Sequence, residues 1–424
     1  MKQKVTSIWV YADWEFLNGP ELMGVLTAQR VRGKEVFSFE YEEAWMTSNR
    51  QLLSLDPNLG FYKGKQYLPD EKTNFGLFLD SSPDRWGRLL MRRREALEAR
   101  EENREEKTLF ETDYLLGVLD ATRMGALRFK LHPEGEFMND RKRMATPPWS
   151  SLRELEYASL QLEREEAISD TEYVNWLKIL IDPGSSLGGA RPKASIIDEK
   201  GQLWIAKFPS ALDNKNYGAW EMVLNRLANA AGIIVPEARI EKFSAKHDTF
   251  LTKRFDRTIS AQRLHYASAM TLLGYSDGTD HVEGVGYLEL AGWIIRNSPA
   301  VKIELEQLWR RLVFNILVSN TDDHLRNHGF LLTPQGWKLA PAFDMNPNEW
   351  GVGLTLNITE QGNQLDLPLA LESAKYYRLH SEEASRILEE IRSAVSAWRE
   401  EALKMGISTR EIELTKRAFR LAEM

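Results

Sequence analysis

The most informative segment of this 424-residue sequence is Asn320-Thr-Asp-Asp-His-Leu-Arg-Asn327. Asp322 lies five residues before Asn327, whereas Asp323 lies four residues before it. Protein kinase catalytic loops place an asparagine five residues after the catalytic aspartate. The aspartate accepts the proton of the substrate hydroxyl, and the asparagine binds magnesium. The spacing therefore predicts a kinase-type catalytic loop in which Asp322, rather than Asp323, is the base.

The residues after this segment support the same interpretation. Phe330-Leu-Leu-Thr and Trp337-Lys-Leu-Ala predict a hairpin across Pro334-Gln-Gly336, which leads to Asp344. A second metal-binding aspartate belongs after such a strand, because Mg²⁺ prefers hard oxygen ligands. The alternative is a polar turn with helix caps. The order of loop, hairpin and second aspartate favours catalysis over that alternative.

Two histidines in the same region raise the question of a transition-metal site. His324 and His328 have no third nitrogen or sulfur ligand nearby at zinc spacing. We therefore expect His324 to hold the loop through hydrogen bonds.

A glycine-rich segment lies upstream, at Asp182-Pro-Gly-Ser-Ser-Leu-Gly-Gly-Ala-Arg-Pro-Lys193. Gly184, Gly188 and Gly189 permit backbone conformations that other residues rarely adopt. Such a loop can turn several N–H groups toward one anion. Taken alone, the segment is consistent with a phosphate cradle and with a plain turn.

A second predicted hairpin follows the glycine-rich segment, with strands at Lys193–Asp198 and Leu203–Phe208. Lys207 ends its apolar second strand, where it either faces solvent or reaches nucleotide phosphates. Kinases place a phosphate-binding lysine at this point and pair it with a glutamate of a helix. Glu221 opens a helical stretch fourteen residues later and is the candidate partner.

The segment Phe250–Arg257 is an apolar strand that runs into a polar turn. A kinase-like hinge would bind adenine there through backbone groups. Taken alone, the pattern favours a strand end with a charged turn.

The N-terminal part reads as a small β-rich subdomain followed by a helical connection. Ser7–Tyr11 and Glu35–Tyr41 are rich in β-forming residues. A helical stretch begins at Pro83 and runs into the mixed charges of Arg92–Lys107. Mixed signs are typical of a solvated helix face or an exposed connection rather than of a nucleic-acid patch.

The C-terminal part is predominantly helical in pattern. Apolar residues recur at helical spacing just before the catalytic segment, which predicts a buried helix there. These residues are Leu305, Leu308, Trp309, Leu312 and Ile316.

The bulk composition is that of an ordinary globular protein. Hydrophobic residues make up 43% and charged residues 28%, and the net charge is −7. An acidic chain is not built to coat DNA. Cysteine is absent, which excludes disulfides and thiolate metal sites. No apolar stretch approaches the length of a membrane span, so we expect a cytoplasmic protein with no membrane partner.

Taken together, the motifs resemble the HipA family, the kinase toxins of bacterial toxin–antitoxin modules. The resemblance covers essentially the whole chain and is carried by Leu79-Asp-Ser-Ser-Pro-Asp-Arg-Trp-Gly, Met124-Gly-Ala-Leu, Ser186-Leu-Gly-Gly-Ala-Arg-Pro-Lys193, Lys207, Arg254-Phe-Asp-Arg257, Asp322-Asp-His-Leu-Arg-Asn327 and Phe343-Asp344.

The resemblance implies an α+β, two-lobed fold related to protein kinases. It suggests an N-terminal subdomain over residues 1–145, a kinase N-lobe part over 146–260 and a helical C-lobe over 261–424. It also implies an ATP- and Mg²⁺-dependent serine/threonine protein kinase.

Site roles follow from the resemblance residue by residue. Lys207 would contact ATP phosphates together with the glycine-loop residues Ser186, Gly188 and Gly189. Asp322 would be the base, with Asn327 and Asp344 holding magnesium. Lys253 and Phe255 would contact adenine, and Asp256 would lie close to the nucleotide. Lys253 departs from the acidic residue expected at its position.

Family members also phosphorylate a serine in their own glycine-rich loop, and Ser186 matches that position, with Ser185 as the neighbour that could substitute. The phosphate adds about −1.5 to −2 charges beside the nucleotide, which would disfavour ATP binding. The family's protein substrates include aminoacyl-tRNA synthetases. The usual partner is a DNA-binding, HipB-like antitoxin, so contact with DNA would be indirect.

Two alternatives stay open from the sequence. The first is a small-molecule or lipid kinase on the same scaffold. The second is a nucleotide-binding module that docks an antitoxin and acts in repression. Retention of Lys207, Asp322, Asn327 and Asp344 argues against the second alternative, because a non-catalytic module need not keep all four.

Overall fold

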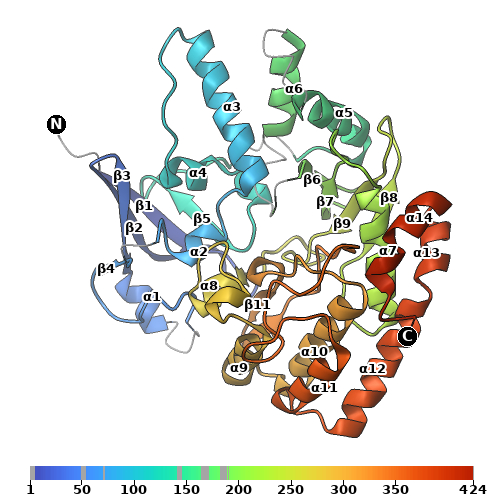
Figure 1. The fold of residues 1–424 in the computed structure, drawn as a ribbon. Helices are drawn as coiled ribbons and strands as arrows, with labels where there is room; N and C mark the ends of the chain where they lie inside the picture. Colours follow the sequence, from blue (N-terminus) through green and yellow to red (C-terminus); the bar gives the residue numbers. More distant parts are fainter. Residues whose placement is uncertain are drawn as a thin grey trace. The chain divides into compact units, whose positions relative to one another are not determined.

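The computed structural model describes residues 5–48, 54–69, 72–140, 146–163, 171–181, 189 and 191–423. Figure 1 labels its helices and strands. The chain forms two compact units, and it passes between them more than once. Unit 1 comprises Met1–Leu212, Phe243–Ala245 and Lys253–Ala267, and unit 2 comprises Asp213–Lys242, Lys246–Thr252 and Ser268–Met424. The three-part division suggested by the family resemblance stays a prediction.

Unit 1 begins with a five-stranded antiparallel sheet in the order β4-β3-β2-β1-β5. Its strands are β1 (Val5–Ala12), β2 (Glu21–Val31), β3 (Lys34–Tyr41), β4 (Gln66–Tyr67) and β5 (Leu127–Lys130). Alternate residues such as Ile8, Val10, Phe37 and Phe39 are buried, as expected for a sheet with one face in the core. The predicted β-rich N-terminal part is confirmed.

The helices of unit 1 are α1 (Glu43–Ser48), α2 (Gly76–Leu79), α3 (Arg85–Glu101), α4 (Glu111–Gly117), α5 (Leu152–Glu163) and α6 (Thr171–Ile181). Helix α3 starts at the N-cap residue Asp84, whose side chain accepts a hydrogen bond from Gly87 N at 2.6 Å. The helix ends at Glu101, so the last residues of the predicted charged stretch lie outside it. The hairpin predicted after the glycine-rich segment is present as β6 (Lys193–Ile197) and β7 (Leu203–Lys207).

Unit 2 is mostly helical and contains two hairpins, β8–β9 and β11–β12. The strands are β8 (Ala238–Glu241), β9 (Thr249–Lys253), β11 (Gly329–Thr333) and β12 (Gly336–Leu339), while the short β10 (Tyr266–Ser268) lies where the chain enters the unit. The helices are α7 (Tyr217–Ala230), α8 (Ala269–Leu273), α9 (Tyr287–Asn297), α10 (Val301–Leu317), α11 (Leu367–Ser373), α12 (Ser381–Ser396), α13 (Trp398–Lys404) and α14 (Thr409–Thr415).

Helix α10 forms the centre of the unit 2 core and leads directly into the predicted catalytic segment. Its residues Leu305, Leu308, Trp309, Leu312 and Ile316 are completely buried. The predicted buried helix is therefore confirmed. Burying these five large side chains anchors the start of the catalytic segment, because each contributes about 1.5–3 kcal/mol of apolar transfer free energy.

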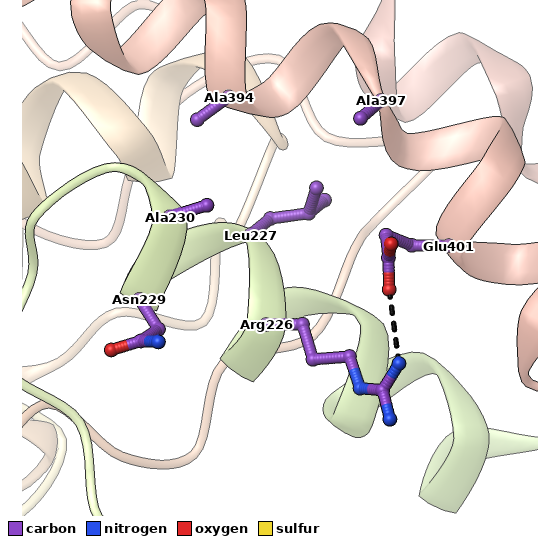
Figure 2. A pocket seen from close by; sticks show the side chains of 7 residues that line it. All are labelled: Arg226, Leu227, Asn229, Ala230, Ala394, Ala397 and Glu401. Carbon is purple, nitrogen blue, oxygen red and sulfur yellow. Dashed lines mark hydrogen bonds and ion pairs between the residues drawn. The ribbon is translucent and has the colours of Figure 1, made fainter.

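A pocket of about 320 Å³ lies between α7 and the α12–α13 pair. Figure 2 shows Arg226 of α7 reaching Glu401 of α13 beside Leu227, Ala394 and Ala397. None of its lining residues belongs to the predicted catalytic segment. None of the helices that the structure describes is long and apolar enough to cross a membrane.

Candidate active site

The candidate residues fall into three clusters, of which the first surrounds the described end of the glycine-rich segment in unit 1. Gly189 O accepts a hydrogen bond from Trp86 N at 3.4 Å, and Trp86 Nε1 donates to Lys193 O at 3.0 Å. Gly189 has a φ of +99°, and a Cβ atom there would lie 2.9 Å from Lys193 Nζ. The backbone conformation and the close lysine both require glycine at this position.

A buried ion pair supports this cluster. Lys193 Nζ lies 3.1 Å from Asp84 Oδ2, and both side chains are almost completely buried. Lys193 also faces Lys207 directly across the β6–β7 hairpin. Like charges directly opposite one another in a sheet repel, and Asp84 offsets that repulsion by neutralising the inner lysine.

Lys207 is half-buried at the end of β7, as the sequence predicts. Glu221 is buried on α7 of unit 2, and the Lys207–Glu221 pair stays a prediction. The predicted loop residues Ser185, Ser186 and Gly188 lie outside the described residues.

The second cluster surrounds the predicted hinge in unit 1. Asp256 is completely buried, and its carboxylate accepts hydrogen bonds from Arg254 Nε at 2.8 Å and from Arg257 Nη1 at 2.7 Å. Burial alone would raise the pKa of Asp256, but the charges of Arg254 and Arg257 and the bonds to this carboxylate hold the pKa well below its usual range. The carboxylate is therefore ionised and fixed by arginines.

Gly125 connects this cluster to a distant part of unit 1. Its N–H donates to Asp256 Oδ2 at 2.9 Å. Gly125 has a φ of +71°, and a Cβ atom there would lie 3.2 Å from Tyr266 N. Arg254 adds bonds from Nη1 to Thr122 O at 2.5 Å and from Nη2 to Arg123 O at 3.2 Å. The two motifs Met124-Gly-Ala-Leu and Arg254-Phe-Asp-Arg257 thus lock together around one carboxylate.

The predicted adenine-contacting residues stand next to this cluster. Lys253 ends β9. Burial alone would raise the pKa of Asp198, but hydrogen bonds from Gln202, Trp204 and Lys200 lower it, and the charge of Lys253 adds to that lowering. The ring of Phe255 lies 5.9 Å from that of Tyr266. Arg254 N donates to Leu203 O at 2.9 Å, which fixes the segment against β7.

The third cluster is the catalytic segment in unit 2, where the two adjacent aspartates differ sharply. Asp322 is exposed, whereas Asp323 is buried. Asn327 is buried, and its Nδ2 donates to Asp322 O at 2.8 Å. This bond uses the amide nitrogen of Asn327 and fixes the backbone of Asp322. The Oδ1 atom of the same amide is the end that can bind a cation.

Asp323 is held by its neighbours instead. Tyr287 donates a short hydrogen bond to Asp323 Oδ2, and His328 Nε2 lies 3.0 Å from Asp323 Oδ1. Burial alone would raise the pKa of Asp323, but His328 and the bond from Tyr287 lower it. Burial and the charge of Asp323 raise the pKa of Tyr287 well above 10, so the phenol keeps its proton. His328 is thus in contact with an acid of this loop, while the expected hydrogen bonds of His324 come from its backbone, which accepts from Asn327 N at 2.9 Å and donates to Asp322 O at 3.2 Å.

A chain of buried amides extends this arrangement. Asn315 Nδ2 donates to the Tyr287 hydroxyl at 3.0 Å, and Asn320 Nδ2 donates to Asn315 Oδ1 at 3.0 Å. Asn346 N in turn donates to Asn320 Oδ1 at 3.2 Å. Helix α10, the catalytic segment and the residues after Asp344 are therefore joined by one continuous polar network.

Asp344 follows the β11–β12 hairpin, as predicted. It has a φ of +59°, a left-handed conformation that few residues other than glycine, asparagine and aspartate adopt readily. Backbone conformations of this kind occur often at functional sites.

Two predicted metal ligands of unit 2 carry oxygen donors of the kind that magnesium prefers, and their joint binding of a metal stays a prediction. Asn327 Oδ1 and the Asp344 carboxylate are hard ligands, and Mg²⁺ is usually held by one or two protein carboxylates together with substrate phosphates. Among the residues that the structure describes, no three histidine, cysteine or acidic side chains gather closely enough to hold a metal by themselves.

Three residues that hold the candidate site residues in place are not among the predicted ones: Asp84, Gly125 and Tyr287. Asp84 and Gly125 do lie in motifs that carry the family resemblance. Tyr287 has no signal in the sequence, because its role depends on the close approach of α9 to the catalytic segment.

Comparisons with known proteins bear on the family and the fold of this chain. The family model described as the HipA-like C-terminal domain matches residues 185–398, which is half of the chain. The serine/threonine-protein kinase toxin HipA of Shewanella oneidensis is 30% identical over 145 residues, covering 30% of this chain and 33% of that protein. A Haemophilus influenzae protein named "Putative kinase" is 26% identical over 207 residues, covering 42% of this chain and 60% of that protein. The matched segments thus span less than two thirds of either relative.

One solved structure matches over nearly the full length. It is a chain of the Shewanella oneidensis MR-1 complex of HipA, HipB and operator DNA, with a TM-score of 0.63, 18% identity and coverage of 99% of this chain and 97% of that chain. This likeness confirms the predicted α+β fold of HipA type.

Proposed function

This chain belongs to the HipA family, and on that premise we propose that it is an ATP- and Mg²⁺-dependent serine/threonine protein kinase that acts as a toxin. The proposal rests above all on the contrast between Asp322 and Asp323. An acid that meets an external hydroxyl must be accessible, and Asp322 is exposed. Asp323 is buried and already bound by Tyr287 and His328, so it is suited to hold the loop.

In the proposed reaction, Asp322 accepts the proton of a serine or threonine hydroxyl as that oxygen attacks the γ-phosphorus of ATP. The bond from the γ-phosphorus to the β–γ bridging oxygen breaks at the same time, and ADP leaves. Asn327 positions Asp322 through the bond from its Nδ2 to Asp322 O. Asn327 Oδ1 and Asp344 would hold Mg²⁺, which neutralises charge on the phosphates when bound. Lys207 would bind the phosphates from the end of β7.

The hinge segment would contact adenine through the backbone of Lys253 and Phe255. Asp256 would stand close to the nucleotide. Because protein donors already bind its carboxylate oxygens, we assign Asp256 the task of holding the hinge in place.

Partner and acceptor are part of the same proposal. The similar structure is a complex with HipB and operator DNA, which supports a HipB-like antitoxin as partner. An aminoacyl-tRNA synthetase is the proposed class of acceptor, and a cytoplasmic location is proposed with it.

We also propose that the kinase phosphorylates its own Ser186, or Ser185, and thereby switches off ATP binding.

The test incubates the purified protein with Mg²⁺, radiolabelled ATP and a bacterial lysate. Wild-type protein should label itself and at least one lysate protein, and Asp322→Asn should lower both signals at least about a hundredfold, as for loss of general base catalysis. Mass spectrometry of the self-labelled chain should find the phosphate at Ser186 or Ser185.

Asp366→Asn is the matched control, because Asp366 is also an exposed aspartate of unit 2. This variant should label normally. Full labelling by Asp322→Asn would disprove the assignment of the base. Transfer to lipids or small metabolites with no labelled protein would favour a small-molecule kinase instead.

A further inference from the structure

The loop that follows Asp344 is fixed directly to the catalytic segment. We call residues 346–353 the platform loop. Asn348 N donates to Ser319 O at 3.1 Å, and Asn348 Nδ2 donates to Thr321 Oγ1 at 2.7 Å. Gly351 packs so closely that a Cβ atom there would lie 2.4 Å from Thr321 Cγ2. Thr321 immediately precedes Asp322, so these contacts fix the platform loop to the backbone next to the proposed base.

Further bonds hold both ends of the platform loop. Lys215 Nζ binds Pro347 O at 3.0 Å and Glu349 Oε2 at 2.8 Å. Arg420 Nη2 reaches Gly351 O at 3.4 Å. A loop with this many anchors is pre-organised, which lowers the entropy cost of binding a partner.

This fixed loop presents two large apolar side chains to solvent. Trp350 and Val352 are each 74% exposed. Single exposed apolar residues are common on protein surfaces. Here Trp350 and Val352 are separated by one residue on an anchored loop that follows the contacts to Thr321. Tryptophan is one of the residue types that are enriched among binding hot spots.

The charge next to Trp350 is positive. Arg417 lies over the Trp350 ring, with its Cζ atom 5.7 Å from the ring centroid. Arg420 Nη1 donates to Arg417 O at 3.0 Å, so a second guanidinium group lies nearby. Burial and the charge of Arg417 lower the pKa of Arg420. Within the described part of the chain, no carboxylate forms an ion pair with Arg417 or Arg420, and the loop's own acid, Glu349, is paired with Lys215.

We propose that the platform loop and Arg417 dock the acceptor polypeptide and select its sequence. Trp350 and Val352 would bind an apolar side chain near the acceptor serine or threonine, and Arg417 would bind an acidic side chain beside it. Charge complementarity identifies this occupant, because a positive group without a carboxylate partner stands over an exposed ring. This inference rests on the proposed protein kinase function.

The test maps phosphorylation sites by mass spectrometry in a phosphatase-treated bacterial lysate incubated with Mg²⁺, ATP and the full-length protein. Sites of the wild type should be enriched in acidic and apolar residues near the acceptor. Trp350→Ala should slow lysate phosphorylation at least about tenfold, the scale of a hot-spot residue. Arg417→Glu should abolish or reverse the acidic preference.

Leu403→Ala and Arg410→Glu are the matched controls, because both residues are exposed in unit 2 and lie outside the platform loop. Both should behave as wild type. All variants should show the same thermal shift with Mg²⁺ and ATP, which establishes that they fold and bind nucleotide.

Three outcomes would overturn the inference. Unchanged rates and unchanged site preferences in Trp350→Ala and Arg417→Glu would remove the docking role while leaving the kinase intact. Loss of the Trp350 effect after ribonuclease treatment of the lysate would identify RNA rather than a polypeptide as the occupant. Labelling of no lysate protein by the wild type would remove the proposed function together with the docking role.

Discussion

Two buried aspartates of this chain, Asp256 in unit 1 and Asp323 in unit 2, are held by different means. Each one supports the candidate functional segment in which it lies. Asp256 is bound by the guanidinium groups of Arg254 and Arg257 and by a backbone N–H. Asp323 is bound by the neutral phenol of Tyr287 and by His328. One aspartate is neutralised by two guanidinium groups, and the other is held by a phenol and an imidazole.

The difference shows how each segment is held. The ionic cluster locks chain segments more than a hundred residues apart, such as Thr122–Gly125 and Arg254–Arg257, and guanidinium groups remain charged at any physiological pH. The network around Asp323 joins the catalytic segment to α9 and α10 of the same unit through a phenol, an imidazole and side-chain amides. Removing an acid should therefore cost stability in unit 1 and mainly activity in unit 2.

The largest expected effect is that of Asp256→Asn. This change leaves two buried guanidinium groups without their counter-charge, and breaking a buried ion pair costs about 3–5 kcal/mol. The free energy of unfolding, measured in urea, should fall by that amount. The exposed control Asp366→Asn should change it by less than about 0.5 kcal/mol. A loss below about 1 kcal/mol for Asp256→Asn would mean that the cluster is not a structural lock.

The next effect in size is that of Asp323→Asn. The asparagine can still accept one bond from Tyr287, so we expect the free energy of unfolding to fall by about 1–3 kcal/mol, the cost of one poorly satisfied buried group. Phosphorylation of lysate proteins should fall more than nucleotide binding does. A stability loss as large as that of Asp256→Asn would contradict the contrast between the two clusters.

The third effect is that of Tyr287→Phe, which removes the donor to Asp323 and keeps the ring. Loss of one buried hydrogen bond to an ionised carboxylate should lower the free energy of unfolding by about 1.5 kcal/mol, the lower end of the range for bonds to charged groups. The change loosens the hold on Asp323 beside the proposed base, so kcat should fall. The predicted nucleotide-binding residues are unchanged, so KM for ATP should stay within about twofold. Tyr377→Phe is a matched control, because Tyr377 is another completely buried tyrosine of unit 2. A fall in kcat as large for Tyr377→Phe would show that the Tyr287 effect is merely structural.

Local patterns in the sequence were sufficient to predict much of the fold. Runs of β-forming residues predicted β1 and β3, helical spacing predicted α10, and the turn residues at positions 334–336 predicted the β11–β12 hairpin. Each depends on residues close together in the chain, which is where periodicity is informative.

The candidate site could be predicted only in part for the same reason. The five-residue step from Asp322 to Asn327 is local, so it distinguished the exposed aspartate from the buried one. The partner of Asp323 comes from α9, and that of Lys193 comes from the start of α3. No local pattern reveals contacts between residues so far apart. The contact between His328 and Asp323 likewise depends on the three-dimensional course of the loop, which the residue spacing does not reveal.

The smallest expected effect is that of pH near neutrality. The pKa values of Asp256 and Asp323 are both lowered in the folded chain, whereas an aspartate in the unfolded chain titrates near about 3.9. A carboxyl group with a depressed folded pKa contributes stability that is fully present above its unfolded pKa and is lost as pH falls through the folded pKa. Asp256 gives the cleaner test, because its partners are guanidinium groups that stay charged at every pH used, whereas Asp323 contacts His328.

The difference in unfolding free energy between the wild type and Asp256→Asn should therefore stay constant from pH 8 to pH 5 and shrink only below about pH 4. Urea unfolding of both chains at each pH measures this difference. A difference that shrinks between pH 8 and pH 6 would show that the carboxylate is not the titrating group that its neighbours imply.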